Sequence, residues 1–438
     1  MRCFRAARRV PGHAPPDAAK PATLSTSGCG TTPRRPNPTP VTSASLASTP
    51  ERIPVTATAG IEELDALRVA VRRLCEKYGH DYYLRTSAES GNAREFWEEL
   101  GDLGALGVAI PEEYGGGGQG IEALAVVAEE IAACGLPLML IALSPAVCAT
   151  MLIDFGSDEQ RASWLPGLAD GSRVLAFAIT EPDAGSNAHN ISTRAVFEDG
   201  DWIITGQKYY VSHVDNADAM VVIANAAGGP DNLPPGPKAF LVPTDAPNLS
   251  RTPIPVEIIS PERQYSLFFD AVRVPADAIV GGEHGLRVLF TGLNPERILS
   301  AALLNGIARY AIEKAADYAR TRIVWSEPIG THQAIAHPLA RAETRLAAAR
   351  LLTLEAARAV DRGETGGVAA AMAKVEASET ASYALDVAIQ THGGNGMARE
   401  YGLATLSGLV RLFRIAPVST EMLLNHIAHR ALRLPRSY

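Results

Sequence analysis

The chain has 438 residues, 47% of them hydrophobic, which is enough to bury large cores in roughly two to four domains. The first 50 residues hold seven of the 40 basic side chains and one acid, Asp17, so 33 basic and 47 acidic side chains remain in the rest. Such an acidic body repels nucleic acid and anionic lipid, and no apolar run approaches the ~20 residues that a bilayer crossing needs. The composition therefore excludes a nucleic-acid-binding protein and a membrane span.

Residues 1–55 are predicted to be a disordered leader, because the first 50 contain nine prolines among many Ser, Thr and Ala residues and no apolar h-region of a secretory signal. The Arg content and the scarcity of acids resemble an organelle transit peptide. However, prolines at 11, 15, 16 and 21 would break the amphipathic helix of such a peptide. We expect a disordered extension or a start codon placed too early, with Val41 as one candidate for the true start.

The cysteines show neither CxxC spacing nor an even framework. This usage favours reduced thiols in a cytoplasmic compartment over disulfides or a zinc site. The five residues are Cys3, Cys29, Cys75, Cys134 and Cys148.

A helical period begins at Ile61 and predicts an N-terminal helical domain over residues 56–172. A second helical stretch starts near Ala93, and a third covers residues 121–134. Between the last two, the glycines at 115, 117 and 120 match GxGxxG, the signature of a dinucleotide-binding turn. We reject that interpretation, because no acid follows at the expected ~20 residues and the next segment is helical where a parallel strand is required.

Between residues 173 and 282 the hydrophobic period changes to two, which predicts a middle β domain. Asp199 and Gly200 predict a hairpin turn between two strands, and Gly206 predicts a second turn. The β-rich runs lie at 174–179, 202–205, 209–212, 220–224, 239–242 and 266–269.

The helical period returns after Gly282 and predicts a C-terminal helical bundle over residues 283–438. Two apolar stripes are expected to face the bundle core. They consist of Leu304, Ile307, Ala311 and Ala315, and of Leu346, Leu351 and Leu354.

Three separated motifs carry the functional signal: Phe-Ala-Ile-Thr-Glu-Pro-Asp-Ala-Gly-Ser at 177–186, the pair Glu296-Arg297, and Gly-Gly-Asn-Gly at 393–396. In this order they resemble the acyl-CoA dehydrogenase flavoprotein family, over about residues 60–435. The resemblance implies an α+β multidomain fold with an N-terminal helical domain, a middle β-barrel or β-sandwich domain and a C-terminal helical bundle. The periodicity indicates the same order independently.

The resemblance also implies an FAD site shared between two subunits, and thus a homodimer or homotetramer. A flavin needs an apolar ring against one face and hydrogen-bond donors along its polar edge. The residues alone also allow roles without a cofactor. Tyr210 could equally pack within a strand, and the Gly-Gly-Asn-Gly run could equally be a helix C-cap. The residues that the resemblance assigns to the flavin ring are Phe177, Ile179, Thr180, Ser186, Tyr210 and Ser212. Those assigned to the diphosphate and adenine are Arg322, Trp325, His332, Gln333, Gln390, His392, Gly393 and Gly394, and Ser419 and Glu421 are further cofactor-binding candidates.

Dehydrogenation of an acyl thioester requires one ionised base at the α carbon. Many relatives carry this Glu in an Ile-Tyr-Glu-Gly-Thr motif, but here the matching residues 415–419 read Ile-Ala-Pro-Val-Ser. The isovaleryl- and long-chain branch carries the base in Leu-x-x-Glu-Arg, which resembles residues 293–297 and assigns Glu296. Asn294, Arg297 and Ser186 are assigned to the substrate, and Arg297 is also expected to orient Glu296. The residues alone equally allow Asn294 and Pro295 to be an N-cap and a first-turn proline that start a helix.

Pro417 lacks the backbone N–H with which relatives polarise the thioester carbonyl. The loss of one such donor typically costs about 10² to 10³ in rate, so the N–H of Val418, a water or a ribityl hydroxyl is expected to replace it. Ala416 stands where relatives carry a bulky Tyr, which favours a branched or larger acyl group.

These observations predict FAD-dependent α,β-dehydrogenation of an acyl-CoA, with Glu296 as the α-proton base and flavin N5 as the β-hydride acceptor. The resemblance implies that the electrons pass to an electron-transfer flavoprotein, within fatty acid metabolism in the cytoplasm. Two alternatives stay open. One is a flavin-dependent monooxygenase or oxidase of the same fold, and the other is a non-catalytic acyl-CoA-binding partner.

Overall fold

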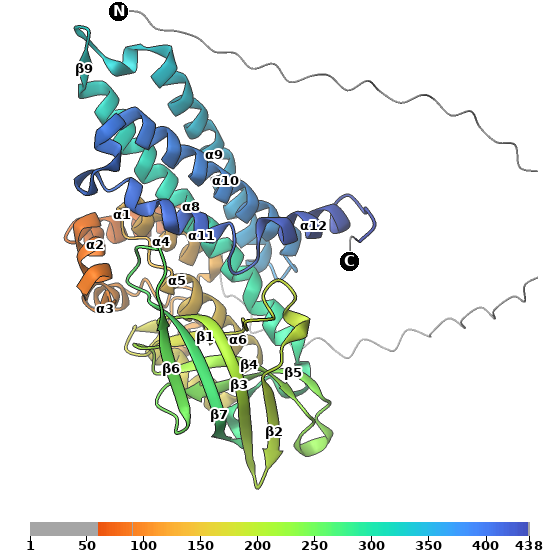
Figure 1. Ribbon diagram of the computed structural model, residues 1–438. Helices are drawn as coiled ribbons and strands as arrows, with labels where there is room; N and C mark the ends of the chain where they lie inside the picture. The colour runs from red at the N-terminus through yellow and green to blue at the C-terminus, as the bar shows by residue number, and fades with distance from the viewer. Residues whose placement is uncertain (1–59, 90, 437–438) are drawn as a thin grey trace, which may run out of the picture. The chain divides into compact units, whose positions relative to one another are not determined.

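The computed structural model describes residues 60–89 and 91–436, which belong to one compact unit. The predicted leader at 1–55 lies outside the described residues. Within them, helices come first, a β-sheet follows and helices return, which confirms the predicted fold class (Figure 1). No helix in the described part of the chain is both long and apolar enough to cross a bilayer.

The N-terminal part contains the three predicted helices and several that the sequence analysis did not predict, of which the first is α2. Its buried rings, Tyr82 and Tyr83, are adjacent and so produce no helical period. The helices are α1 (Ile61–Cys75), α2 (Gly79–Glu89), α3 (Arg94–Asp102), α4 (Gly120–Ala133), α5 (Leu140–Ala142), α6 (Ala149–Phe155) and α7 (Asp158–Ala169), with a π-helical turn at Leu143–Cys148.

The rejection of a dinucleotide-binding turn is confirmed, because the glycine-rich segment follows a short 3₁₀ turn, Glu112–Tyr114, and leads directly into α4. A side chain of the protein itself occupies the start of α4. The Asp361 carboxylate accepts the N–H groups of Ile121 and Glu122 at 2.7 and 2.9 Å. These are the donors that would otherwise face a phosphate.

The middle part is an eight-stranded sheet in the order β6-β7-β3-β2-β4-β5-β8, with β1 paired in parallel to β4. The predicted hairpin is confirmed: Glu198 pairs with Asp201, and Asp199 and Gly200 both have positive φ. The strands are β1 (Leu175–Ala178), β2 (Arg194–Glu198), β3 (Asp201–Ser212), β4 (Ala219–Ala226), β5 (Gly236–Pro243), β6 (Leu249–Ile254), β7 (Gln264–Pro275) and β8 (Ile279–Val280).

The prediction of a turn at Gly206 is wrong. Gly206 lies inside β3, where the register against β7 shifts. Its φ is 152°, and a Cβ there would lie 2.6 Å from Thr193 Oγ1. The glycine therefore allows a close approach between neighbouring strands at a bulge, not a reversal of the chain.

The C-terminal part is built on α8 (Leu286–Thr321), a helix of 36 residues whose predicted stripe, residues 304, 307, 311 and 315, is fully buried. The second predicted stripe is wrong in part, because Leu351 is 70% exposed. Leu351 lies five residues after the buried Leu346, about 140° away around the helix, and Ala349 and Thr353 are buried instead. The other elements are β9 (Ile323–Val324), β10 (Glu327–Pro328), α9 (Gln333–Asp361), α10 (Gly367–His392), α11 (Ser407–Phe413) and α12 (Thr420–Arg430).

Candidate active site

A buried ion pair anchors the loop at 179–187. Lys208, on β3, is 0% exposed and donates to Glu181 Oε1 at 2.8 Å and to the Ile179 carbonyl at 2.9 Å. Glu181 also accepts the backbone N–H groups of Ser192 at 2.7 Å and of Thr193 at 3.0 Å. Burial alone would raise the pKa of Glu181, but the hydrogen bonds from Lys208, Ser192 and Thr193 lower it to about 2. Burial lowers the pKa of Lys208 to about 8, although Glu181 acts to raise it.

The residues predicted to contact the flavin ring lie around this anchor. Phe177 on β1 is half-buried, and the carbonyl of Thr180 accepts the N–H of Tyr209 at 2.8 Å. Ser186 is exposed, and Tyr210 is 54% exposed with a φ of 55°. The fold thus fixes the backbone beneath the loop and leaves the Tyr210 side chain accessible.

Glu296 lies in the interior of α8. The helix begins ten residues earlier, at Leu286, and Pro295 is one of its internal residues. The alternative in which Asn294 caps a helix that starts at Pro295 is therefore wrong. An internal proline lacks the N–H that would bond to the carbonyl of Thr291, four residues earlier.

The carboxylate of Glu296 is buried, with 3% of the residue exposed, and is held on one side only. Ser300, one turn later and 0% exposed, donates to Oε1 at 2.5 Å. Oε2 has no hydrogen-bond partner among the described residues. Buried carboxylate oxygens are normally satisfied, so an unpaired one marks a position for a reacting or binding partner.

The helical turn before Glu296 shares a hydrophobic cluster with residues of β1 and the loop that follows it. Leu293, three residues before Glu296, shares a hydrophobic cluster with Leu289 and with the partly buried Phe177 and Ile179. Leu293 therefore connects the helical turn before Glu296 to the cluster that contains two of the predicted flavin-contacting residues.

Arg297 interacts with Asn294 instead of with the Glu296 carboxylate. Its Nη1 donates to Asn294 Oδ1 at 3.0 Å, and Asn294 Nδ2 donates to the carbonyl of Thr365 at 2.7 Å. Burial lowers the pKa of Arg297, with the Glu296 charge acting in the opposite direction. The residue that orients Glu296 is Ser300, which sequence reasoning missed although its i,i+4 spacing puts it on the same helical face.

Lys374 on α10 joins this region to the segment after α11. It is 1% exposed, and its Nζ donates to the carbonyls of Ala416 at 2.8 Å and Val418 at 3.3 Å. Burial lowers the pKa of Lys374 to about 8, while the charge of Glu296 raises it. Ser419, which follows, caps α12 by accepting the N–H of Met422, and Glu421 is exposed in the first turn.

The residues predicted to bind the FAD diphosphate and adenine gather at the far end of α8. Tyr318 stacks on His392 with ring centroids 4.3 Å apart, and its hydroxyl accepts a hydrogen bond from Asn395 Nδ2, so Gly393 and Gly394 lie near the C-terminal end of α8. The backbone at both glycines is open, since a Cβ there would meet nothing within 4 Å. In the hairpin, Trp325 is 90% exposed, and Arg322, His332, Gln333 and Gln390 are also exposed.

The two groups of predicted cofactor residues do not meet within one chain. Leu293 and Tyr318 are separated by roughly 25 residues of one helix, or about 37 Å at 1.5 Å per residue. If both groups bind the same FAD, a second chain must supply one of them.

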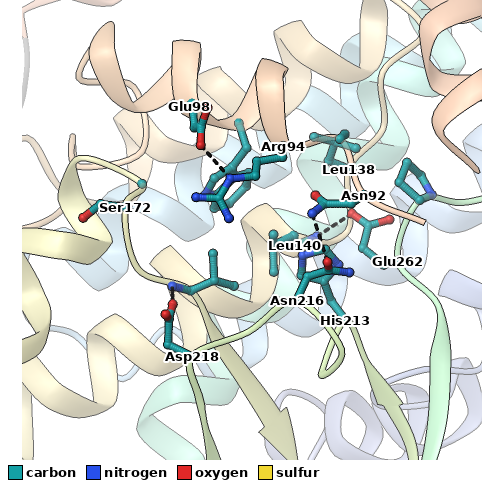
Figure 2. A pocket seen from close by; sticks show the side chains of 15 residues that line it. Asn92, Arg94, Glu98, Leu138, Leu140, Ser172, His213, Asn216, Asp218 and Glu262 are labelled. Atoms are coloured by element: carbon teal, nitrogen blue, oxygen red, sulfur yellow. Dashed lines mark hydrogen bonds and ion pairs between the residues drawn. The ribbon is translucent and has the colours of Figure 1, made fainter. Parts of the chain in front are cut away.

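A separate polar pocket of about 100 Å³ lies where α3 approaches the β domain (Figure 2). None of the predicted site residues lines it. Trp97 Nε1 and His213 Nδ1 lie buried there without a partner among the described residues. Burial lowers the pKa of His213 to about 4, so its imidazole is neutral at neutral pH. The volume is large enough to hold several water molecules.

Comparison with known proteins agrees with this architecture. Models of the acyl-CoA dehydrogenase N-terminal, middle and C-terminal domains match residues 61–172, 176–272 and 283–432. Acyl-CoA dehydrogenase FadE12 of Mycobacterium tuberculosis is 50% identical over 383 residues, 86% of this chain and 98% of FadE12.

Two solved structures are similar over nearly their whole length. Butyryl-CoA dehydrogenase from Megasphaera elsdenii has a TM-score of 0.80 at 26% identity, over 86% of this chain and 100% of that one. Glutaryl-CoA dehydrogenase from Mycobacterium smegmatis, in complex with FADH2, has a TM-score of 0.80 at 25% identity, over 87% and 97% of the two chains. With all three domain models matched in order and FadE12 similar almost from end to end, the chain belongs to the acyl-CoA dehydrogenase family.

Proposed function

We propose that this protein is an FAD-dependent acyl-CoA dehydrogenase in which Glu296 removes the α proton of an acyl-CoA thioester. The observation that carries the proposal is the carboxylate itself: it is 3% exposed, Ser300 fixes it at Oε1, and no described residue hydrogen-bonds to Oε2. A base must be held in place and must keep one lone pair free for the proton that it takes. Glu296 satisfies both conditions, next to the cluster that contains Phe177 and Ile179.

The reaction converts a saturated acyl-CoA into its 2,3-unsaturated product. The α proton moves to Oε2 of Glu296, the β hydrogen leaves with its electron pair, and a double bond forms between the two carbons. Bound FAD supplies the two-electron acceptor for that hydride. The protein holds the carboxylate, and burial of Glu296 keeps water from competing for it.

The described residues fit an FAD site on two grounds. The ion pair between Lys208 and Glu181 holds the backbone of the loop at 179–187 in place. Ser186 in this loop and Tyr210 on the neighbouring strand are exposed. Gly393 and Gly394 present open backbone, which suits close approach by phosphate oxygens. Because these two regions are far apart in one chain, the proposal includes a homodimer or homotetramer with FAD bound between subunits.

The test is an anaerobic titration of the purified flavoprotein with straight, branched and ring-bearing acyl-CoAs, followed by flavin absorbance. We expect loss of the oxidised flavin band with at least one acyl-CoA and no consumption of oxygen when oxygen is present. Electron-transfer flavoprotein, the proposed acceptor, should then restore the band, and gel filtration should give a dimer or tetramer.

The same titration separates the alternatives. A monooxygenase or oxidase would consume oxygen in proportion to product, and a non-catalytic partner would bind acyl-CoA without bleaching the flavin. Free thiols at Cys75, Cys134 and Cys148 accord with the proposed cytoplasmic location.

A further inference from the structure

Two residues at the end of β3 have a left-handed backbone. Tyr210 has a φ of 55° and His213 a φ of 61°, and they bracket Val211 and Ser212. A side chain other than glycine seldom adopts such a φ, and a bulky one such as tyrosine does so least readily. Backbone of this kind persists only where the surrounding structure enforces it, and it gathers at functional sites. Strand pairing alone does not require this conformation at the end of β3.

The left-handed backbone of Tyr210 is part of a β-bulge. From Lys208 to Val211 β3 advances by three residues, while its partner β7 advances by two, from Leu267 to Tyr265. A bulge re-aims a side chain of the strand that carries it, and the Tyr210 side chain is 54% exposed. The bulge thus presents the Tyr210 ring to the outside while the pairing of the two strands continues.

His213 begins a turn that other elements hold at every residue. Its carbonyl accepts the N–H of Asn216 at 3.1 Å, which closes the turn at 213–216. The contacts that hold this turn come from β6, from β7 with the residue before it, and from the segment before α3. They are the His213 N–H to the Arg263 carbonyl at 2.9 Å, Arg251 Nη1 to the Val214 carbonyl at 3.1 Å, the Tyr265 hydroxyl to Asp215 Oδ2 at 2.9 Å, and Asn92 Nδ2 to Asn216 Oδ1 at 3.0 Å (Figure 2).

The His213 side chain does not account for the conformation of its own backbone. It is 4% exposed and lines the polar pocket beside Trp97, where its Nδ1 has no partner among the described residues. A buried polar atom without a partner costs free energy. Nδ1 therefore contributes no hydrogen bond from the described residues that would fix the turn, and the contacts of the turn itself hold His213 left-handed.

We propose that His213 is a positioning residue for the flavin: its left-handed backbone, held in the turn at 213–216, fixes the end of β3 in the conformation that presents Ser212 and Tyr210 to the ring. This inference rests on the proposed function, because it requires these two residues to contact FAD. Ser212 is restrained further by its hydroxyl, which donates to Gln264 Oε1 at 3.0 Å. A binding site needs such supporting contacts, because a displaced contact group loses its interaction with the ligand.

The test replaces His213 with residues that differ in their tolerance of a left-handed backbone. His213→Asn keeps a residue that adopts it readily, whereas His213→Val introduces a β-branched side chain that does not. The matched control is Asp199→Val, since Asp199 has a φ of 54° in the exposed hairpin at the opposite end of the same strand. Each apoprotein is titrated with FAD, without substrate, and flavin fluorescence gives the dissociation constant. Urea denaturation of the same samples measures stability.

We expect His213→Val to weaken FAD binding about tenfold, which is the effect of losing roughly one hydrogen bond to the flavin, and to shift the flavin absorption band. His213→Asn should bind FAD as the wild type does and keep the wild-type band. Asp199→Val should lose stability but retain wild-type FAD affinity. If His213→Val does not fold, His213→Ala replaces it, because alanine tolerates the left-handed backbone less well than asparagine. Its FAD affinity should then be lower than that of His213→Asn.

Wild-type FAD affinity in folded His213→Val, or equal affinity of His213→Ala and His213→Asn, would overturn the inference. An equal loss of affinity in Asp199→Val would also do so, because general destabilisation would then be the cause. An equal loss in His213→Asn would show that the imidazole matters instead of the backbone. The proposed function fails separately: a wild-type rate of flavin reduction in Glu296→Gln defeats the assignment of the base and does not alter these FAD affinities.

Discussion

Ser300 donates its hydroxyl hydrogen to Oε1 of Glu296, 2.5 Å away and one turn earlier on α8, while Oε2 of this buried carboxylate has no partner in the described part of the chain. The hydroxyl selects one orientation of a side chain that has three rotatable bonds. Ser300→Ala removes that restraint with little change in volume. Hydrogen bonds to charged groups contribute about 1.5–3 kcal/mol, so flavin reduction should slow about tenfold or more while acyl-CoA affinity is kept.

Stopped-flow reduction of the flavin measures this effect. The matched control is Ser382→Ala, which removes a hydroxyl bonded to the Ser378 carbonyl on α10 and should leave the rate unchanged. Wild-type reduction by Ser300→Ala would show that Glu296 needs no orienting partner.

Glu296→Gln keeps the shape of the side chain but removes the lone pair that accepts the α proton. We expect reduction to slow at least ~10²-fold, as is typical when a general base is removed, while ligand binding persists. Glu198→Gln, at the exposed end of β2, is the control and should behave as wild type. An unimpaired Glu296→Gln would remove the basis of the proposed chemistry.

Glu181→Gln breaks the ion pair beneath the predicted flavin loop. Removal of one partner leaves the Lys208 ammonium buried and uncompensated, which typically costs about 3–5 kcal/mol of the free energy of unfolding. Urea denaturation of the apoprotein measures the loss, and FAD affinity should fall with it. Lys77→Met disrupts an ion pair with Glu99 that is mostly exposed, so it should cost less than about 1 kcal/mol. Equal losses in the two variants would contradict the anchoring role.

The same ion pair predicts a pH dependence. The pKa of Glu181 is lowered to about 2 in the folded protein, so its contribution is fully present above its ordinary value of 4.5 and is lost as the pH falls towards 2. The difference in free energy of unfolding between wild type and Glu181→Gln should therefore be constant between about pH 5 and 6 and shrink below pH 5. Urea titrations at pH 6, 5, 4 and 3 test this, and a difference that does not change with pH would count against an ionised Glu181.

The sequence by itself determined the order and type of the main elements. The change from a helical period to a period of two and back reports which faces are buried, and this information is local. The hairpin at Asp199 and Gly200 followed from turn chemistry in the same way. The family motifs also directed attention to Glu296, although the residues alone equally allowed the start of a helix.

The tertiary structure decided which polar groups meet. Lys208 reaches Glu181 across 27 residues, Lys374 reaches Ala416 across 42, and Asp361 caps α4 from 240 residues away. Periodicity cannot predict such partners, because it describes one element and a contact requires two. The prediction that Leu351 is buried fails for a related reason. An apolar residue is buried only if another element covers its face, and no element in the described part of the chain covers Leu351. Local pattern therefore gave the scaffold, and packing between distant elements made the site.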